Sequence, residues 1–200
     1  MSSTRVILIG GPSHSGKSSL AIEMAKKLGW SHVSTDRMAR HPGRPWKTDT
    51  TAVPGQVADH YLSLSVDELI ADVMRHYNRM WPGIEALVRT HASDLSADRL
   101  ILEGSAVLPE RVAALDVDGV AALWLTADSE LLEARVHASS GYNRAAPGEK
   151  ALVQKFVERN HRYNDRMMDA VNRLGLVSFH VGTVSSIDDL TERCIGLVAR

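Results

Sequence analysis

Eight consecutive residues near the start of the chain have the types and the spacing of a polyphosphate-binding loop. Residues 11–18 read Gly-Pro-Ser-His-Ser-Gly-Lys-Ser and fill every position of the pattern G-x-x-x-x-G-K-[ST]. Backbone N–H groups of such a loop, with the positive end of the following helix, surround phosphate charges without bulky side chains intervening. We therefore expect a nucleoside triphosphate to bind Gly11, Pro12, Ser13, His14, Ser15, Gly16, Lys17, Ser18 and Ser19.

Two side chains of this loop have predicted chemical roles. Lys17 would reach the β- and γ-phosphates during catalysis, and the Ser18 hydroxyl would ligate Mg²⁺. The flanking residues favour this interpretation, because residues 5–9 are an apolar, β-branched run typical of a buried strand and residues 17–28 have the pattern of a helix. An ordinary glycine-rich turn between a strand and a helix is the alternative.

The composition is that of a soluble globular protein and narrows the possible partners. Of 200 residues, 44% are apolar and 24% charged, and the net charge is −1, so no overall field favours nucleic acid. No apolar run approaches the roughly 18 residues of a membrane span, and no signal peptide is expected before the first strand. The single cysteine, Cys194, is expected in the core, and the cytoplasm is the expected compartment. The nine histidines show no zinc-ligand spacing.

Strands alternate with helices along the chain, which predicts a parallel sheet with helices on both faces. Between residue 36 and about residue 57 we expect irregular structure, and at 139–149 a loop rich in Gly, Pro and Ser. The predicted strands are 5–10, 31–34, 99–103, 119–125 and 176–181. The predicted helices are 16–28, 58–80, 82–94, 109–115, 128–138, 150–173 and 186–198.

An acidic residue follows the second predicted strand. In open parallel sheets ligands gather outside the carboxyl ends of the strands, which is where Asp36 would lie. Its carboxylate could accept the proton of an attacking substrate hydroxyl or help to hold Mg²⁺. Asp is also a favoured helix N-cap, and both roles can hold together.

A second acid ends the third predicted strand. Glu103 closes the apolar run 100–102 and precedes Gly104, which lets the chain turn. A buried acid is costly unless it is paired, ligated or hydrated. We expect Glu103 to hold Mg²⁺ together with Ser18, and Glu103 and Gly104 to border the substrate; a structural ion pair is the alternative.

The segment 37–47 is rich in cations and interrupted by Pro and Gly. Arg37, Arg40 and Arg44 would offer forked donors to a carboxylate or phosphate on the acceptor. A surface loop with incidental charge is the alternative.

The last predicted long helix has an apolar stripe flanked by cations. Its basic stripe, set about a third of a turn away, suits a surface that borders a cleft, although a plain solvated face is an equal alternative. An arginine that closes over the triphosphate would neutralise charge that develops during transfer and would expel water. The stripe consists of Lys155, Arg159, Arg162 and Arg166.

With these residues in place, the chain resembles the small P-loop kinases, a group that includes shikimate, gluconate and nucleoside monophosphate kinases. Residues 34–37 (Ser-Thr-Asp-Arg) and 102–109 (Leu-Glu-Gly-Ser-Ala-Val-Leu-Pro) are similar to stretches of 2-phosphoglycerate-kinase-like proteins. The resemblance implies an α/β, three-layer P-loop NTPase fold with a five-stranded parallel sheet and a small lid. It implies one domain over 1–200, with an acceptor-binding insertion at about 36–98 and a lid at about 137–150.

The resemblance also implies Mg-ATP as donor and phosphoryl transfer to a hydroxyl or phosphate of a small molecule. Asp36 would act on the acceptor, and Arg135, Arg144 and Arg159 would supply the lid arginines. The chain departs from the group in its few lid arginines and in its long 36–98 stretch, so the substrate does not carry over.

A small-molecule kinase, monomeric or homodimeric, is the leading hypothesis. The alternative is a nucleotide-dependent switch or a partner-regulated ATPase. The chain lacks the D-x-x-G element and the N-K-x-D guanine reader that GTPase switches usually have. A third interpretation, a kinase-like toxin that phosphorylates a cell-wall nucleotide sugar, differs only in its acceptor.

Overall fold

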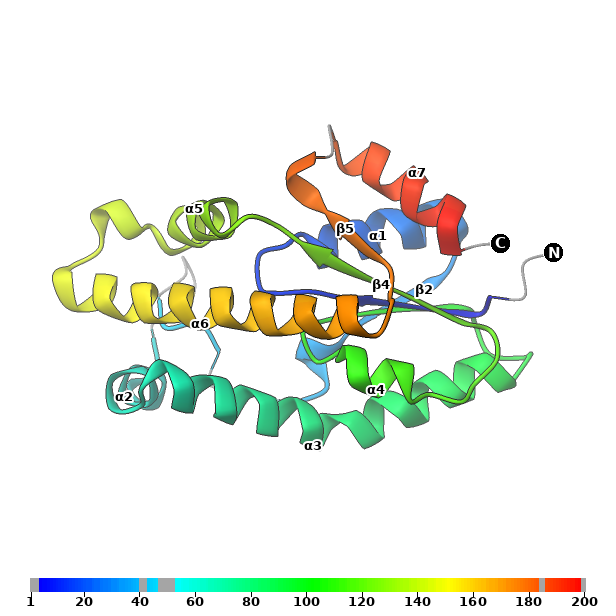
Figure 1. Ribbon diagram of the computed structural model, residues 1–200, viewed down its shortest axis with the longest axis horizontal. Helices are drawn as coiled ribbons and strands as arrows, with labels where there is room; N and C mark the ends of the chain where they lie inside the picture. Colours follow the sequence, from blue (N-terminus) through cyan, green and yellow to red (C-terminus); the bar gives the residue numbers. More distant parts are fainter. Residues whose placement is uncertain (1–3, 40–42, 47–52, 184–185, 199–200) are drawn as a thin grey trace.

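The computed structural model describes residues 4–39, 43–46, 53–183 and 186–198. Its five strands form one parallel sheet, as predicted, and their order in the sheet is β2-β3-β1-β4-β5 (Figure 1). Neighbouring parallel strands must be joined by crossover connections, and helices form these connections in this chain. The strands are β1 (Val6–Gly10), β2 (Ser31–Ser34), β3 (Leu100–Glu103), β4 (Val120–Thr126) and β5 (Ser178–His180).

Helices cover both faces of the sheet, which gives the three layers. α1 (Lys17–Leu28) and α7 (Ile187–Val198) pack on one face, while α3 (Val66–Ser93), α4 (Pro109–Ala113) and α6 (Pro147–Arg173) pack on the other (Figure 1). Successive side chains of β1 point to opposite faces, so Leu8 joins the α3–α6 core and Ile9 joins the α1–α7 core. The central strands are therefore apolar except at their carboxyl ends, where Glu103 and Thr126 lie.

The first half of α6 extends past the carboxyl ends of the strands, between α2 (Gly55–Ser63) and α5 (Ser129–Ser140) (Figure 1). A third apolar cluster stabilises this projection and includes Trp46, Tyr61 and Phe156. The projection thus has an apolar core of its own beside the sheet. None of the described helices is long and apolar enough to cross a bilayer.

The helix break inside the insertion differs from the predicted one. We predicted helices at 58–80 and 82–94, separated at Pro82, but the chain forms α2 and then α3, and Pro82 lies inside α3. Ser65 and Glu68 form a capping box that begins α3. Trp81 and Ile84, on either side of the proline, are buried in the core, and this burial offsets the cost of about 3 kcal/mol of an interior proline.

The predicted loop 139–149 is largely helical. α5 continues to Ser140, a 3₁₀ turn covers Tyr142–Arg144, and α6 begins at Pro147. Proline suits the first turn of a helix because its missing N–H has no intrahelical partner there, and Glu149 accepts from the Ala146 N–H. The segment predicted as a lid, 137–150, therefore consists of the end of α5, the 3₁₀ turn and the start of α6.

Candidate active site

The loop between β1 and α1 has the backbone of a phosphate cradle. Gly11 (φ 145°), His14 (φ 65°) and Gly16 (φ 96°) have positive φ values, which aim successive N–H groups inward. A Cβ on Gly11 would lie 2.6 Å from the carbonyl oxygen of Leu125. The Ser15 hydroxyl is buried and has no hydrogen-bond partner among the described residues. An orphaned polar group in a loop of this curvature fits an anion such as a triphosphate.

Lys17 lies buried inside the cradle. Its ammonium donates to the carbonyl oxygen of Pro12 at 2.7 Å. Burial lowers the pKa of Lys17 to about 8, although the carboxylates of Glu103 and Asp36 oppose this shift. A buried ammonium held between backbone and two acids is placed to bind phosphate oxygens.

The two predicted metal ligands lie next to each other. Ser18 at the start of α1 donates its hydroxyl hydrogen to Glu103 Oε1 at 3.1 Å. Glu103, at the end of β3, is only 2% exposed. A hydroxyl and a carboxylate beside a phosphate cradle are the oxygen donors that Mg²⁺ prefers. The site therefore fits Mg²⁺ bound with a nucleotide, and the predicted helix-loop-strand arrangement of Ser18 and Glu103 is present.

His14 links the loop to the helices beyond it. Its Nε2 lies 2.9 Å from Ser139 Oγ, whose hydrogen is donated to the Val136 carbonyl, so Nε2 carries the ring proton. Nδ1 then accepts from Ser13 Oγ at 3.0 Å. Burial, followed by the positive charge of Arg44, lowers the pKa of His14 to about 4, which keeps the ring neutral.

Helix α6 holds the loop from the opposite side through Asn160. The Ser13 N–H donates to Asn160 Oδ1 at 2.9 Å, and Asn160 Nδ2 donates to the Ser13 carbonyl at 3.0 Å. The asparagine is buried. Sequence reasoning missed this residue, because an asparagine within a long helix carries no local signal of a partner 147 positions away.

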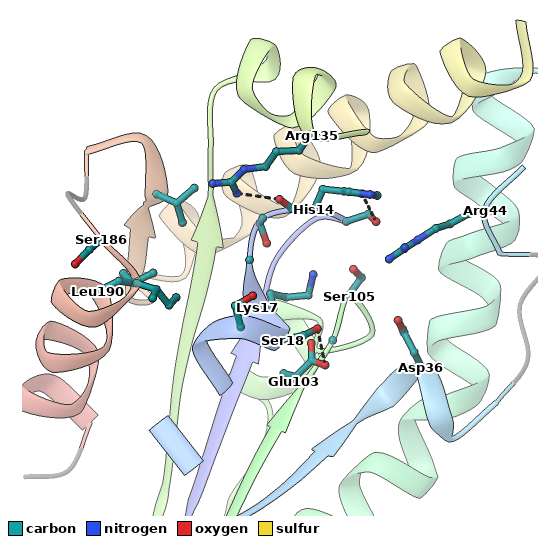
Figure 2. Close-up of a pocket in the computed structure, with 17 residues that line it drawn as sticks. His14, Lys17, Ser18, Asp36, Arg44, Glu103, Ser105, Arg135, Ser186 and Leu190 are labelled. Atoms are coloured by element: carbon teal, nitrogen blue, oxygen red, sulfur yellow. Dashed lines mark hydrogen bonds between the residues drawn. The ribbon is translucent and has the colours of Figure 1, made fainter. Parts of the chain in front are cut away.

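A cavity of about 650 Å³ contains the loop and both metal-ligand candidates. Residues 13–19, Asp36, Glu103 and Arg135 line it, and its far end is formed by Ser186 and Leu190 at the start of α7. Figure 2 shows Asp36 and Arg44 on one side of Lys17, with Ser186 and Leu190 on the other. This cavity has room for phosphates over the loop and for a base toward α7.

A second cavity of about 310 Å³ adjoins the first. Asp36, Arg44, Ser13 and Ser105 border both cavities. Two of its walls come from α3, with Tyr77, and from α6, with Arg159. These four shared residues form the junction between the two cavities.

The end of β2 places Asp36 at this junction. Ser34 caps the 3₁₀ turn Thr35–Arg37 by accepting from the Asp36 N–H, so the Asp36 carboxylate is left exposed to the cavities instead of serving as the cap. Gly104 packs against Thr35, where a Cβ would lie 1.7 Å from Thr35 Oγ1. The close approach of the β2 and β3 ends sets the distance between Asp36 and Glu103.

The predicted arginines divide into four groups. Arg135 lines the first cavity and donates to the His14 carbonyl at 3.0 Å. Arg44 lines both cavities. Arg37 and Arg144 are exposed and line neither, and Arg40 lies outside the described residues.

We expected Arg159 among the lid arginines. The structure places it buried at the wall of the second cavity, where Nη1 donates to the Tyr61 hydroxyl at 2.7 Å. Two other members of the predicted basic stripe are bound to neighbours: Lys155 donates to the Tyr61 carbonyl at 2.8 Å, and Arg162 pairs with Asp67 and Glu158. Arg162 and Arg166 are nevertheless exposed, so part of the stripe faces solvent.

Solved structures of kinases share this architecture. A gluconokinase from Sinorhizobium meliloti 1021 superposes with a TM-score of 0.56 at 18% identity, over 100% of this chain and 94% of that chain. A deoxyadenosine kinase from M. mycoides with bound dATP gives 0.51 at 14% identity, over 96% and 97%. The chain has the fold of the P-loop kinases. The resemblance predicted from the sequence is confirmed at the level of the fold.

Among curated proteins, parts of two tRNA dimethylallyltransferases are similar in sequence. The one from Caulobacter sp. (strain K31) is 39% identical over 69 residues, and the one from Geobacter metallireducens (strain ATCC 53774 / DSM 7210 / GS-15) is 32% identical over 88 residues. These matches cover 34% and 41% of this chain. The chain spans only 22% and 28% of those relatives. No protein-family profile matches the chain.

Proposed function

We propose that this protein is a kinase that transfers the γ-phosphoryl group of Mg-ATP to a hydroxyl of a small molecule. The observation that carries the proposal is the junction of the two cavities, where Asp36 borders both the phosphate cradle and the smaller acceptor-side cavity. A carboxylate at that junction is the group a hydroxyl acceptor needs.

The donor side stabilises charge on the phosphates. Backbone N–H groups of residues 13–18 and the Lys17 ammonium would bind the phosphate oxygens, and Ser18 with Glu103 would hold Mg²⁺. Mg²⁺, when bound, neutralises part of the phosphate charge. Arg135 reaches the loop from α5 and would offset charge that develops during transfer.

The acceptor side orients the attacking group. Asp36 would accept the proton of the acceptor hydroxyl as its oxygen attacks phosphorus. Arg44, whose side chain borders the same junction, supports an acceptor that bears a carboxylate or phosphate (Figure 2). Asp36 and Arg44 together fix the two ends of the acceptor.

The test is an assay of ADP formation against a metabolite panel, with the Asp36→Asn variant. We expect the variant to lose at least a hundredfold in kcat with an unchanged Kd for Mg-ATP, because general-base catalysis contributes about 10²–10⁴-fold. The Lys17→Ala variant serves as the control that loses nucleotide binding. Full turnover by Asp36→Asn would remove Asp36 from the mechanism.

The similarity to tRNA dimethylallyltransferases favours a second candidate, a transferase whose donor carries another group on its polyphosphate. A net charge of −1 supplies no general attraction for the phosphates of tRNA, which weighs against that candidate. Formation of ADP and a phosphorylated acceptor would favour the kinase. Hydrolysis that no metabolite pool alters but a protein partner raises would favour the switch hypothesis.

A further inference from the structure

A histidine that the proposed reaction does not use lies beside the candidate metal site. His32 is the second residue of β2, and its Nε2 atom is buried with no hydrogen-bond partner among the described residues. That nitrogen lies 3.9 Å from Oε1 of Glu103. A buried polar atom without a partner is uncommon in folded proteins and needs an explanation. Its neighbour here is a carboxylate that we expect to hold Mg²⁺.

The strand register places the two side chains on the same face of the sheet. His32 is level with Ile101 of β3, and Glu103 follows two positions later. Side chains two positions apart on a strand point to the same face. Ile101 belongs to the core formed with α1 and α7, so His32 and Glu103 both point toward the α1 side. Ser18, at the start of α1, contacts Glu103 from that helix.

The carboxylate of Glu103 is held from one side. It is 2% exposed, and among the described residues the Ser18 hydroxyl is its only hydrogen-bond donor, at 3.1 Å (Figure 2). The neighbouring Lys17 ammonium donates to the Pro12 carbonyl. A carboxylate has two oxygens with about four acceptor positions, and burial makes the unfilled ones costly. A second donor would satisfy the group and fix its orientation.

A small rotation brings the histidine within hydrogen-bond range. An N–H···O bond needs about 2.7–3.2 Å between its heavy atoms, so the 3.9 Å from Nε2 to Oε1 is somewhat too long. The last torsions of Glu and His side chains are broad, so a shift of this size costs little. A carboxylate only accepts hydrogen bonds, so the bond requires the ring proton on Nε2. His32 would then donate from β2 while Ser18 donates from α1.

The orientation of Glu103 matters because Mg²⁺ is demanding about geometry. Its ligands must approach an octahedron at about 2.0–2.1 Å, so an oxygen that swings away binds it weakly. Ser18 donates its hydrogen to Glu103, which leaves the lone pairs of Ser18 available to a cation. The position of Glu103 therefore orients both candidate ligands. Groups that hold metal ligands in place contribute about 10–100-fold to metal affinity.

We propose that His32 is a positioning residue for Mg²⁺ binding: its Nε2–H donates to Glu103 and holds that carboxylate beside Ser18 when the cation is bound. This inference rests on the donor half of the proposed function, the binding of a Mg-nucleotide at the loop. His32 lines neither cavity, so it acts on the cation through Glu103 and not by direct contact.

The experiment measures metal affinity without turnover. Mn²⁺, which takes the same oxygen ligands as Mg²⁺, is titrated into the full chain in excess over a β,γ-imido analogue of ATP, and EPR reports the free cation. We expect His32→Leu to raise the Kd for Mn²⁺ about 10–100-fold, while calorimetry in EDTA gives an unchanged Kd for the analogue. An unchanged Mn²⁺ affinity in His32→Leu would overturn the inference.

Two amide substitutions form a matched pair at this position. The side-chain nitrogen of Gln reaches as far as Nε2 of histidine, whereas that of Asn reaches only as far as Nδ1. His32→Gln should therefore keep the Kd for Mn²⁺ within about threefold of the unsubstituted chain, and His32→Asn should lose as much affinity as His32→Leu. Equal losses in the two amide variants would show that His32 only packs the strand, which also overturns the inference.

Glu103→Gln tests whether the histidine acts through the carboxylate. It should weaken Mn²⁺ binding by itself, and His32→Leu added to it should weaken binding no further, because the partner is already gone. Additive losses, or an unchanged affinity in Glu103→Gln, would contradict the positioning role. Calorimetry of the unsubstituted chain with Mg-ATP separates the two proposals: absent binding contradicts the kinase itself, while normal binding with no effect of His32→Leu contradicts only this inference.

Discussion

At the scale of single residues, the charge of Lys17 is governed by the loop that encloses it. Removal from water lowers its pKa, and the nearby carboxylates of Glu103 and Asp36 recover only part of the shift. The ammonium predominates at pH 7 because the pKa remains about 8. Nucleotide phosphates would add further negative charge, so the protonated form is the one that binds.

The affinity for Mg-ATP should therefore fall as the pH rises through about 8. With Lys17 deprotonated in about nine of ten molecules at pH 9, we expect a Kd roughly tenfold higher than at pH 7. Isothermal calorimetry at both pH values measures this. Lys17→Met should bind weakly at both, without the step. Equal Kd values for the unaltered chain would contradict the assignment.

Gly104 is the second residue whose local geometry sets the site. Gly104→Ala places a Cβ against Thr35 at a φ of 153°, which should cost about 1–3 kcal/mol of unfolding free energy and move Asp36. Urea unfolding and kcat are the measurements. Gly148→Ala is the matched control, because nothing lies within 4 Å of its added Cβ. Equal stability of the two variants would exclude the close packing of Gly104.

At the scale of elements, α6 connects the phosphate loop with the second cavity. Asn160 binds the backbone of Ser13 with two hydrogen bonds, and the preceding residue, Arg159, lines the second cavity. Asn164, one turn on, is bonded to Thr126 at the end of β4. The helix thus contacts the sheet, the loop and the second cavity within two turns.

Asn160→Leu should loosen the phosphate loop without altering the wall of the second cavity. It leaves the Ser13 N–H and carbonyl unpaired, and each hydrogen bond contributes about 1 kcal/mol, so the Kd for Mg-ATP should rise at least tenfold. A fluorescent nucleotide analogue measures the affinity. Asn172→Ala, exposed near the end of the same helix, is the control. A variant with unchanged nucleotide affinity would show that α6 does not support the loop.

At the scale of the whole molecule, the site lies where the sheet ends and the projection of α2, α5 and the first half of α6 begins (Figure 1). The two cavities share only a few residues at their junction. A ligand that contacts the loop, the sheet and α6 at the same time can bind only to the folded protein, because these elements come together only on folding. Nucleotide binding should therefore stabilise the protein as a unit.

Mg-ATP at a hundred times its Kd should add about 2.7 kcal/mol to the free energy of unfolding. For a domain of this size that raises Tm by about 5–10 °C. Thermal unfolding followed by fluorescence measures the shift, and Lys17→Ala should abolish it. An unaltered Tm in the unsubstituted chain would contradict nucleotide binding at the loop.

Local signals in the sequence determined the phosphate loop, the parallel sheet and the acids that follow β2 and β3. The loop motif is contiguous, and strand ends converge in any parallel sheet, so Lys17, Ser18, Asp36 and Glu103 could be placed together without coordinates. Their convergence around one cavity confirms that reasoning.

Tertiary packing alone decided the continuity of α3 through Pro82, the residues that line the second cavity and the support of the loop. Helical periodicity assigns Arg159 to a flank of α6 but does not say whether that flank meets solvent, lid or cavity. Pro82 lies within α3 on its exposed face, because Trp81 and Ile84 on either side of it are buried in the core. The hydrogen-bond partner of Asn160 is Ser13, which lies 147 positions earlier in the chain. Such choices depend on which surfaces pack together, a property of the folded molecule that no short stretch of sequence contains.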